Sequence, residues 1–311
     1  MTAARELPVW RSLLFVPVNV ERFVESAHRR DADVIQLDLE DSVPPSEKDR
    51  ARTLVPAAAA KVARGGAEVV VRINRPLAMA VRDIEASVCP GVAGLALPKV
   101  TSADHVKLLA EHTAEVEAKQ GMAIGTTKFI AMVETADAWF RMREIADADP
   151  RVVALTLGAE DFATSVGMLP EPENLLAPKQ AMVIAAAAAG VLPLGFVGSI
   201  AGYQDLDGFR QIIRRSRALG FRGAGCIHPD QARILNEEFA PQPDELAHAT
   251  RVVEAYQAAQ REGRGAISID GRMIDVPVVE RAQALLDWQA RIVARKEHRA
   301  GRMLPSDVPT V

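Results

Sequence analysis

Residues 128–161 read KFIAMVETADAWFRMREIADADPRVVALTLGAED. The first part is an apolar run that ends on Glu134, and a helical segment follows over about Ala136–Ala146. A second apolar run, Val152–Gly158, then leads to Asp161. The order strand, helix, strand predicts two parallel strands in one sheet, because a parallel pair needs a crossover connection of this length.

Both runs are almost continuously apolar, which is typical of strands buried on both faces of a sheet. In folds built this way, ligands bind at the carboxyl ends of the strands. Glu134 and Asp161 stand just past two such ends, and paired hard oxygen ligands suit Mg²⁺. They could equally be ordinary loop or helix-cap carboxylates, and the spacing alone leaves both possibilities open.

The same alternation extends over most of the chain. The predicted strands are Ser12–Val18, Val34–Glu40, Glu68–Asn74, Gly94–Val100, Lys128–Glu134, Val152–Gly158, Leu192–Gly198 and Gly223–His228. Helical segments follow them. Eight strand–helix units predict a closed (β/α)₈ TIM barrel over residues 10–239. The alternative is a doubly wound open sheet, which typically has a glycine-rich phosphate-binding turn after an early strand. The turn Val16–Asn19 is not glycine-rich.

The alternation of strands and helices ends after residue 239. A helix is predicted over Asp244–Arg261, and a hairpin that turns on Asp270-Gly271 follows it. A last helix is predicted over Val278–Arg295, and the residues after Gly301 are expected to be frayed or disordered. Residues 240–300 therefore form a C-terminal helical and hairpin extension.

The composition limits the class of protein. The 311 residues carry a formal net charge of −4, so nothing argues for a nucleic-acid or anionic-membrane partner. Cys89 and Cys226 are the only cysteines, which indicates a reducing compartment and no disulfide framework. No apolar signal-peptide core is visible at the N-terminus, and the alanine run Ala185–Ala189 is too short to span a bilayer. The expected location is cytoplasmic.

Charged side chains recur at the strand ends. Asp38 and Glu40 share one face of the second strand, Arg72 and Asn74 share one face of the third, and Lys99 ends the fourth. One such charge could be a structural salt bridge at the barrel rim, but a succession on one rim is better explained by a polar site. Inside a barrel mouth these charges must be paired or metal-bound, since an unpaired buried charge is costly.

Several motifs together resemble one family. They are Arg11–Pro17 (RSLLFVP), Asp38–Val43 (DLEDSV), Lys48 with Ala51-Arg52, Val71–Asn74 (VRIN), Leu97–Lys99 (LPK), Glu134, Gly158–Asp161 (GAED), Ile227–Pro229 with Gln231, and Gly271 with Met273–Asp275 and Pro277. In this order and spacing they resemble the citrate lyase β-subunit/malyl-CoA lyase family, the CoA-ester branch of the HpcH/HpaI aldolase group. The resemblance runs from Arg11 to Asp287.

The resemblance implies a TIM barrel with Mg²⁺ on Glu134 and Asp161. It implies that Arg72 faces a 2-oxo acid and its developing oxyanion. It also implies that Asp275 is a catalytic acid or base that completes the active site of a neighbouring subunit, in a homotrimer or a dimer of trimers. The candidate substrate-binding residues are Arg72, Arg11, Asp38, Glu40 and Lys99.

The implied reaction is Mg²⁺-dependent cleavage or formation of a β-hydroxyacyl-CoA thioester from an acyl-CoA and a 2-oxo acid. Malyl-, citramalyl- and citryl-CoA are the expected kinds of substrate. The chain has Val18 where the family usually has glycine, and the segment around Gly195 lacks the usual aspartate. These departures motivate an alternative, a CoA-independent Mg²⁺-dependent aldolase acting on pyruvate- or oxaloacetate-type substrates. A further alternative is a non-catalytic subunit of a citrate-lyase-like complex.

Overall fold

The computed structural model describes residues 5–198, 205–263 and 265–302. Its strands are β1 (Ser12–Pro17), β2 (Val34–Asp38), β3 (Glu68–Arg72), β4 (Gly94–Leu97), β5 (Lys128–Val133), β6 (Val152–Leu157), β7 (Leu192–Leu194) and β8 (Ala224–Cys226). They form one parallel sheet in the order β7-β6-β5-β4-β3-β2-β1-β8. A bridge between Leu194 and Gly223 joins the two ends of the sheet. The predicted TIM barrel is therefore confirmed.

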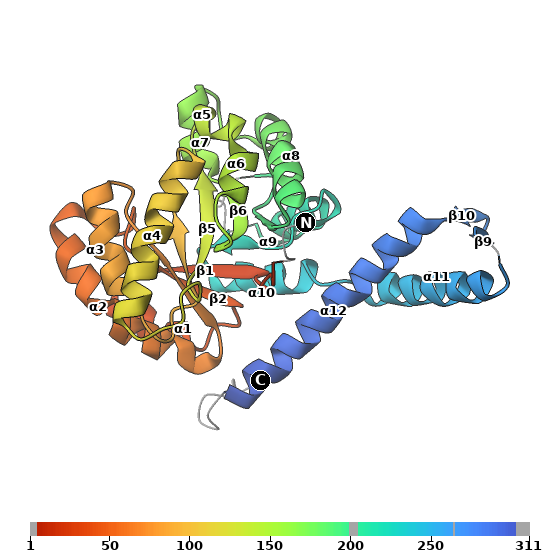
Figure 1. Cartoon of the computed structure of the whole chain (residues 1–311), viewed down its shortest axis with the longest axis horizontal. Coiled ribbons are helices and arrows are strands. Elements are labelled where there is room, and N and C mark those ends of the chain that lie inside the picture. The colour runs from red at the N-terminus through yellow and green to blue at the C-terminus, as the bar shows by residue number, and fades with distance from the viewer. Residues whose placement is uncertain (1–4, 199–204, 264, 303–311) are drawn as a thin grey trace. The chain divides into compact units, whose positions relative to one another are not determined.

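Helices on the outside of the strands connect them (Figure 1). They are α1 (Glu21–Ala27), α2 (Lys48–Val62), α3 (Leu77–Ser87), α4 (Ala103–Lys119), α5 (Ala136–Phe140), α6 (Met142–Asp147), α7 (Ala159–Val166), α8 (Pro172–Ala189), α9 (Leu206–Ala218) and α10 (Pro229–Glu238). Short 3₁₀ turns at Pro45–Glu47 and Ala63–Gly65 flank α2. Among the described residues, no helix has both the length and the apolar character needed to cross a bilayer.

Successive strand residues pack into two different apolar cores, because side chains alternate between the faces of a sheet. Phe129 belongs to the core between strands and helices, whereas Ile130 belongs to the core inside the barrel. Both are buried, with exposed fractions of 0% and 2%. This double burial explains why the strands read as continuous apolar runs rather than as an alternating pattern.

The structure corrects the predicted elements around the sixth strand. The expected helix over Ala136–Ala146 breaks at Arg141 into α5 and α6. A short helix that was not predicted, α7, begins directly after β6, so Asp161 lies in its first turn and not in a loop. β7 is also shorter than predicted, because the strand ends before Gly195, whose φ of +132° is a conformation that favours glycine.

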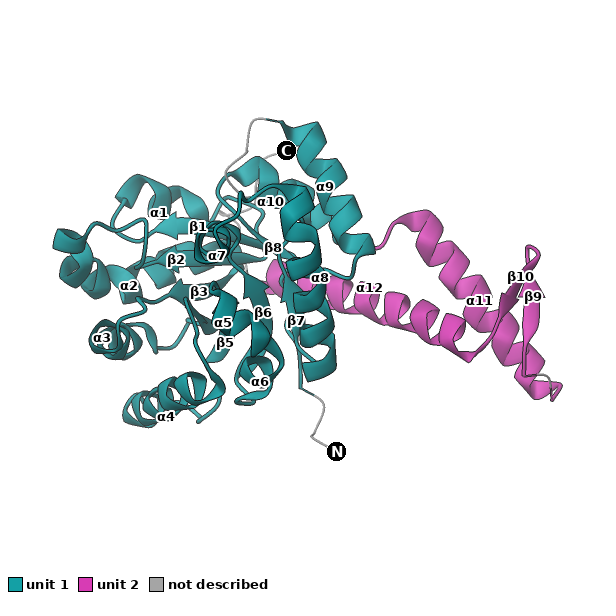
Figure 2. Ribbon diagram, turned by 90° about the horizontal axis from the view of Figure 1, so that it is seen from above, with its two compact units in different colours: residues 1–239, 302–311 teal, residues 240–301 magenta. Residues whose placement is uncertain are grey.

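Residues up to Phe239 form one compact unit, and Ala240–Gly301 form a second (Figure 2). The second unit contains α11 (Pro243–Arg261), a hairpin of β9 (Ile267–Ile269) and β10 (Arg272–Ile274), and most of α12 (Val276–Arg302). The hairpin turns on Asp270 and Gly271 as predicted. Their φ values of +52° and +75° are both positive, as a type I′ turn requires.

The hairpin has its own apolar contacts within the second unit. Ile274 packs in a cluster with Val252 and Tyr256 of α11, and Ile267 packs against the same cluster. The last helix is longer at both ends than predicted. The tail beyond it, residues 303–311, lies outside the described residues, so the structure says nothing about the expected fraying there.

Candidate active site

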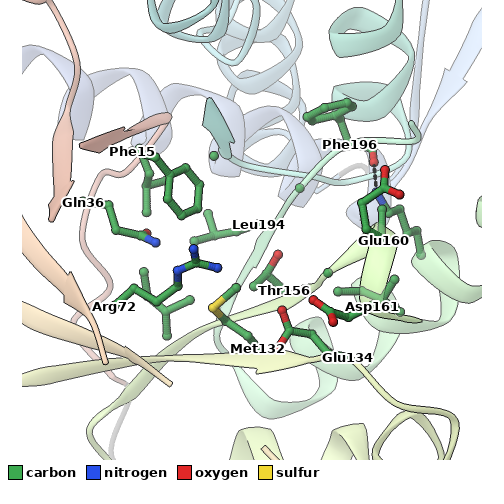
Figure 3. A pocket seen from close by; sticks show the side chains of 18 of the residues that line it. Phe15, Gln36, Arg72, Met132, Glu134, Thr156, Glu160, Asp161, Leu194 and Phe196 are labelled. Atoms are coloured by element: carbon green, nitrogen blue, oxygen red, sulfur yellow. Dashed lines mark hydrogen bonds between the residues drawn. The ribbon is translucent and has the colours of Figure 1, made fainter. Parts of the chain in front are cut away.

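A cavity of about 260 Å³ lies at the carboxyl ends of the barrel strands. Its lining comes from β1, β2, β3, β5, β6, β7 and β8 together with α7 and α8. Figure 3 shows Arg72 on the left, the carboxyl groups of Glu134 and Asp161 to its right, and Phe196 above them. The cavity therefore brings together three residues that the sequence placed at strand ends.

Glu134 directly follows β5 and is only 3% exposed. Its Oε2 accepts a hydrogen bond from the backbone N–H of Lys99 at 2.6 Å. Burial, and next the nearby Glu40 carboxyl, raise the pKa of Glu134 to about 7. Asp161 approaches from the first turn of α7, and its side chain is 44% exposed. One carboxyl group is thus buried and fixed, while the other is open to the cavity and to solvent.

Lys99 connects several of these acids. Its φ of +49° is uncommon for a residue other than glycine, and in this conformation its backbone N–H donates to Glu134. Its ammonium Nζ lies 3.0 Å from Glu40 Oε1 and 3.5 Å from Asp161 Oδ2. Lys99 therefore partly neutralises Glu40 and Asp161, although one barrel strand lies between its own strand and the strand that precedes each of these acids.

Arg72 is held by three carboxylates. Its Nε and Nη2 donate to the two oxygens of Asp38 at 2.8 Å each, which is a bidentate pair. Its Nη1 lies 3.0 Å from Glu40 Oε2 and 3.1 Å from Asp41 Oδ2. The guanidinium carbon is 5.2 Å from the centre of the Phe15 ring. These contacts fix the guanidinium in the wall of the cavity.

Asp38 is a positioning residue in this arrangement. Its oxygens also accept the backbone N–H groups of Glu40 at 2.9 Å and Ser42 at 3.1 Å. Burial alone would raise the pKa of Asp38, but the hydrogen bonds and charge of Arg72 hold it below its usual value. Asp38 is therefore an ionised acid whose oxygens are already engaged, and its role is to orient Arg72.

The mouth holds more acids than bases. Its charged groups are the carboxyls of Asp38, Glu40, Asp41, Glu134, Glu160 and Asp161 and the side chains of Arg72, Lys99 and Lys179. Burial raises the pKa of Glu40 as well as that of Glu134, so a bound cation would favour the ionised form of both carboxyls. Within the described ranges no group of three or more potential metal-ligating side chains occurs. A pair of carboxylates nevertheless fits Mg²⁺, which takes its remaining ligands from water and substrate.

Gly158, between β6 and α7, leaves room for Glu134. A Cβ on Gly158 would lie 2.6 Å from Glu134 Oε1 and 2.7 Å from its Cγ. We expect Gly158→Ala to displace the carboxylate and weaken Mg²⁺ binding about tenfold or more, because a displacement of this size breaks a metal–oxygen contact. Calorimetric titration with Mg²⁺ measures this.

The matched control is Gly265→Ala in the second unit, where an added Cβ meets no atom within 4 Å. Equal Mg²⁺ affinities for Gly158→Ala and this control would show that the close packing of Gly158 on Glu134 has no bearing on the metal.

The prediction that Arg11 binds substrate is wrong. Arg11 precedes β1, at the opposite end of the strand from the cavity. Its Nε and Nη2 donate to Asp33 at 2.8 and 2.9 Å, and its Nη1 donates to the carbonyl of Asn236. The residue is 4% exposed. Arg11 therefore forms a buried structural ion pair, and its place in a motif reflects the fold and not the site.

Two polar residues of the cavity wall were not predicted. Gln36 on β2 is 3% exposed, and its buried Nε2 has no hydrogen-bond partner among the described residues. Lys179 on α8 is also 3% exposed. Both could have been noticed in the sequence, Gln36 as an amide within a buried strand and Lys179 as a lone charge in an apolar, alanine-rich helix.

Asp275 lies in the second unit, between β10 and α12. Its carboxylate accepts the N–H of Val278 at 3.4 Å, and its carbonyl accepts the N–H groups of Val278 and Val279 at 3.1 Å. Within its own chain Asp275 thus caps the last helix. Its action in a neighbouring active site remains a prediction.

Known proteins are similar to this chain in sequence and architecture. A family model described as HpcH/HpaI aldolase/citrate lyase matches residues 11–229. Citrate lyase subunit beta of Leuconostoc mesenteroides subsp. cremoris is 36% identical over 279 residues, which is 89% of this chain and 92% of the relative. The L-malyl-CoA/beta-methylmalyl-CoA lyase of Rhodobacter capsulatus is 31% identical over 299 residues, covering 89% and 93%.

A solved structure gives the same result. Protein CitE of Mycobacterium tuberculosis, crystallised with magnesium, acetoacetate and coenzyme A, superposes with a TM-score of 0.70 at 31% sequence identity. The match covers 90% of this chain and 97% of that one. Fold, motifs and relatives agree with the resemblance that the sequence showed, and the chain belongs to the HpcH/HpaI aldolase/citrate lyase family.

Proposed function

We propose that this protein is a Mg²⁺-dependent carbon–carbon lyase that cleaves or forms a β-hydroxyacyl-CoA thioester. The products of cleavage would be acetyl-CoA or another acyl-CoA and a 2-oxo acid. The observation that carries the proposal is the Glu134–Asp161 carboxyl pair beside Arg72 in one cavity. The relatives named as citrate lyase subunit beta and L-malyl-CoA/beta-methylmalyl-CoA lyase support the reaction class. The magnesium and coenzyme A bound to the similar solved structure support the proposal that this protein binds Mg²⁺ and a CoA thioester.

The side chains divide the chemistry among them. Glu134 and Asp161 would hold Mg²⁺, which when bound supplies a Lewis acid and a template for the carboxylate and keto oxygens of the 2-oxo acid. Arg72 would stabilise the negative charge that develops on the keto oxygen as the carbon–carbon bond breaks or forms. Asp38 and Glu40 hold its guanidinium in place before substrate arrives, so little reorganisation is needed during the reaction.

Asp275 would move the proton at the thioester. In the condensation direction it would take a proton from the α-carbon of the acyl-CoA, and in cleavage it would return that proton to the enolate. By the family resemblance, it would act in the site of a neighbouring subunit of a homotrimer or a dimer of trimers. Met273 and Val276, on either side of it, are 70% and 50% exposed. Exposed apolar side chains next to an acid suit a segment that docks on another surface.

Mixing two inactive variants tests this sharing. Glu134→Gln damages the metal site in the barrel, and Asp275→Asn damages the proposed proton carrier in the extension. If a site takes its barrel from one chain and Asp275 from another, some sites in a mixed oligomer contain neither defect. We expect thioester-cleavage activity to return when the two variants are mixed under conditions of subunit exchange.

The control mixture is Glu134→Gln with Asp161→Asn. Both changes lie in the same barrel cavity, so no exchange of whole subunits can produce an intact site. Activity that fails to return in the first mixture, although exchange is demonstrated by mass spectrometry, would mean that Asp275 acts within its own chain or not at all.

The substrate is best identified by direct cleavage assays. Malyl-, citramalyl- and citryl-CoA would be incubated with the protein, with and without Mg²⁺, and the products identified by mass spectrometry. We expect one of them to be cleaved only when Mg²⁺ is present. Cleavage of none, by a protein that binds Mg²⁺ and is folded, would contradict the proposal.

One observation favours the CoA-independent aldolase as a second candidate. The end of β7 and the residues after it, Leu194, Gly195 and Phe196, put no acid at the cavity mouth, where the family usually has one. Thermal unfolding with millimolar acetyl-CoA separates the two candidates. A raised melting temperature supports the CoA-ester lyase, because a ligand that binds only the folded protein stabilises it. An unchanged melting temperature favours the aldolase.

A further inference from the structure

The buried lysine of the cavity wall has an unusual environment. Lys179 lies in the middle of α8, and its Nζ donates to the backbone carbonyls of Phe196 at 2.5 Å and Gly198 at 2.8 Å. The same Nζ is 5.4 Å from the centre of the Phe196 ring. These contacts tie the ammonium group to the segment that follows β7.

Counting only the described residues, these contacts leave part of the ammonium group unused. An ammonium has three N–H donors and no acceptor, and two of the three are satisfied by carbonyls. Among the described residues no carboxylate lies within ion-pair distance of Nζ. Glu160 is the acid that acts on it from farther away, while burial lowers the pKa of Lys179 to about 7. Within the described part of the chain, the fold thus keeps a buried lysine without a close counter-charge beside the cavity.

Such an arrangement is costly unless something compensates it. Buried charges in proteins are normally paired with an opposite charge, because desolvation of the ion is otherwise unopposed. Lys179 is part of the lining of the cavity that contains Glu134 and Asp161. Its Nζ is bonded to the carbonyl of Phe196, and Figure 3 shows Phe196 above the carboxyl pair and Arg72 to the left of it. The carboxyl pair therefore shares its cavity with two basic residues, Arg72 and Lys179.

We propose that Lys179 binds a second carboxylate of the substrate and makes the site selective for a dicarboxylic 2-oxo acid. The inference rests on the proposed function, in which the first carboxylate and the keto oxygen are held at the Glu134–Asp161 pair. A 2-oxo acid that ends in a methyl group would leave the third N–H of Lys179 unpaired. A second carboxylate supplies both the missing acceptor and the missing negative charge.

Calorimetric titration of the full-length protein in the presence of Mg²⁺ tests the assignment. The probes are pyruvate, with one carboxylate, and oxaloacetate, with two. We expect the wild-type protein to bind oxaloacetate about tenfold or more tightly than pyruvate, the scale of one charge-assisted hydrogen bond. Lys179→Met should remove this preference while changing the affinity for pyruvate by less than about threefold. Lys179→Arg should keep the preference, because it keeps the charge.

Lys48→Met is the matched control. The ammonium of Lys48 also donates to two backbone carbonyls near the barrel mouth, those of Leu39 and Glu40, but it does not line the cavity. Its loss should change both affinities by the same factor and leave their ratio as in the wild type. If Lys179→Met also weakens both ligands equally, Lys179 only supports the backbone after β7, and the inference is wrong.

Two further outcomes separate this inference from the proposed function. A wild-type protein that cleaves a CoA thioester but binds both oxo acids equally overturns the inference and leaves the function standing. A protein that prefers oxaloacetate through Lys179 but cleaves no CoA thioester overturns the function and leaves the inference standing. Failure of both oxo acids to bind in the presence of Mg²⁺ overturns the inference together with the proposed mode of substrate chelation.

Discussion

Glu134→Gln and Asp161→Asn should each lower the rate of thioester cleavage by about 10²-fold or more, the scale of losing a main electrostatic stabiliser of the transition state. Each change keeps the shape of the side chain but removes a negatively charged oxygen ligand. Glu134 should be the more sensitive, because its carboxyl is buried and held by the Lys99 N–H, whereas Asp161 is partly exposed. Mg²⁺ titration by calorimetry and steady-state kinetics measure the two effects.

Asp137→Asn is the matched control for Asp161→Asn. Asp137 also lies in the first turn of a helix that follows a barrel strand, but its side chain is 69% exposed and pairs with Arg141. Its loss should leave Mg²⁺ affinity unchanged. Wild-type affinity in both Glu134→Gln and Asp161→Asn would remove the pair as metal ligands.

The buried state of Glu134 also predicts a pH dependence of stability in metal-free protein. Its pKa is raised from 4.5 to about 7, so between these values the folded state binds the proton and the unfolded state does not. The free energy of unfolding should therefore fall as the pH rises through this window, by about 3 kcal/mol in total. Urea unfolding of wild type and Glu134→Gln, compared from pH 4 to 8, measures it, and identical profiles would contradict the assigned environment.

Arg72→Lys should lower kcat/KM by about 10²-fold or more while the protein remains folded. A guanidinium can hold both oxygens of Asp38 and still reach Glu40 and Asp41, as it does here. An ammonium has no planar fork and cannot reproduce these contacts. The developing oxyanion would then meet a cation that is neither fixed nor correctly directed. Steady-state kinetics, with circular dichroism to check the fold, measure the loss.

Arg151→Lys is the control for the effect of breaking a bidentate arginine–carboxylate pair on the stability of the fold. Arg151 makes a buried bidentate pair with Glu117, at 2.8 and 2.7 Å, but it stands before β6, at the other end of the barrel from the cavity. Its replacement should lower the free energy of unfolding without reducing kcat/KM of the folded protein. Wild-type kinetics in Arg72→Lys would show that Arg72 is only a salt bridge at the rim.

Much of the architecture follows from local patterns in the sequence. Apolar runs such as Phe129–Val133 require burial on both faces, and their alternation with helical segments leads to a parallel barrel. Parallel strands also place their carboxyl ends at one rim, so Glu134, Arg72 and Lys99 could be assigned to one site before any distance was known. The turn at Asp270-Gly271 was equally local, because few residues adopt positive φ at two successive positions.

The ion-pair partner of each charged residue could not be predicted from its neighbours in the sequence. Arg11 and Arg72 both stand at ends of barrel strands, yet Arg11 meets Asp33 at one end and Arg72 meets Asp38 at the other. Which end a side chain occupies depends on strand direction, and which acid it meets depends on the register between neighbouring strands. α7 was missed for a related reason, since a helix of eight residues has too short an apolar pattern to be distinguished from a loop.

The sequence by itself therefore determined the barrel, the rim that carries the site and the family to which the chain belongs. Only the tertiary structure decided that Asp38 orients Arg72, that Gly158 makes room for Glu134, and that Lys179 is a buried cation beside the same cavity. The physical reason is that secondary structure depends on side-chain periodicity along a few turns of chain. Charge pairing and burial depend on contacts between segments that only closure of the barrel brings together.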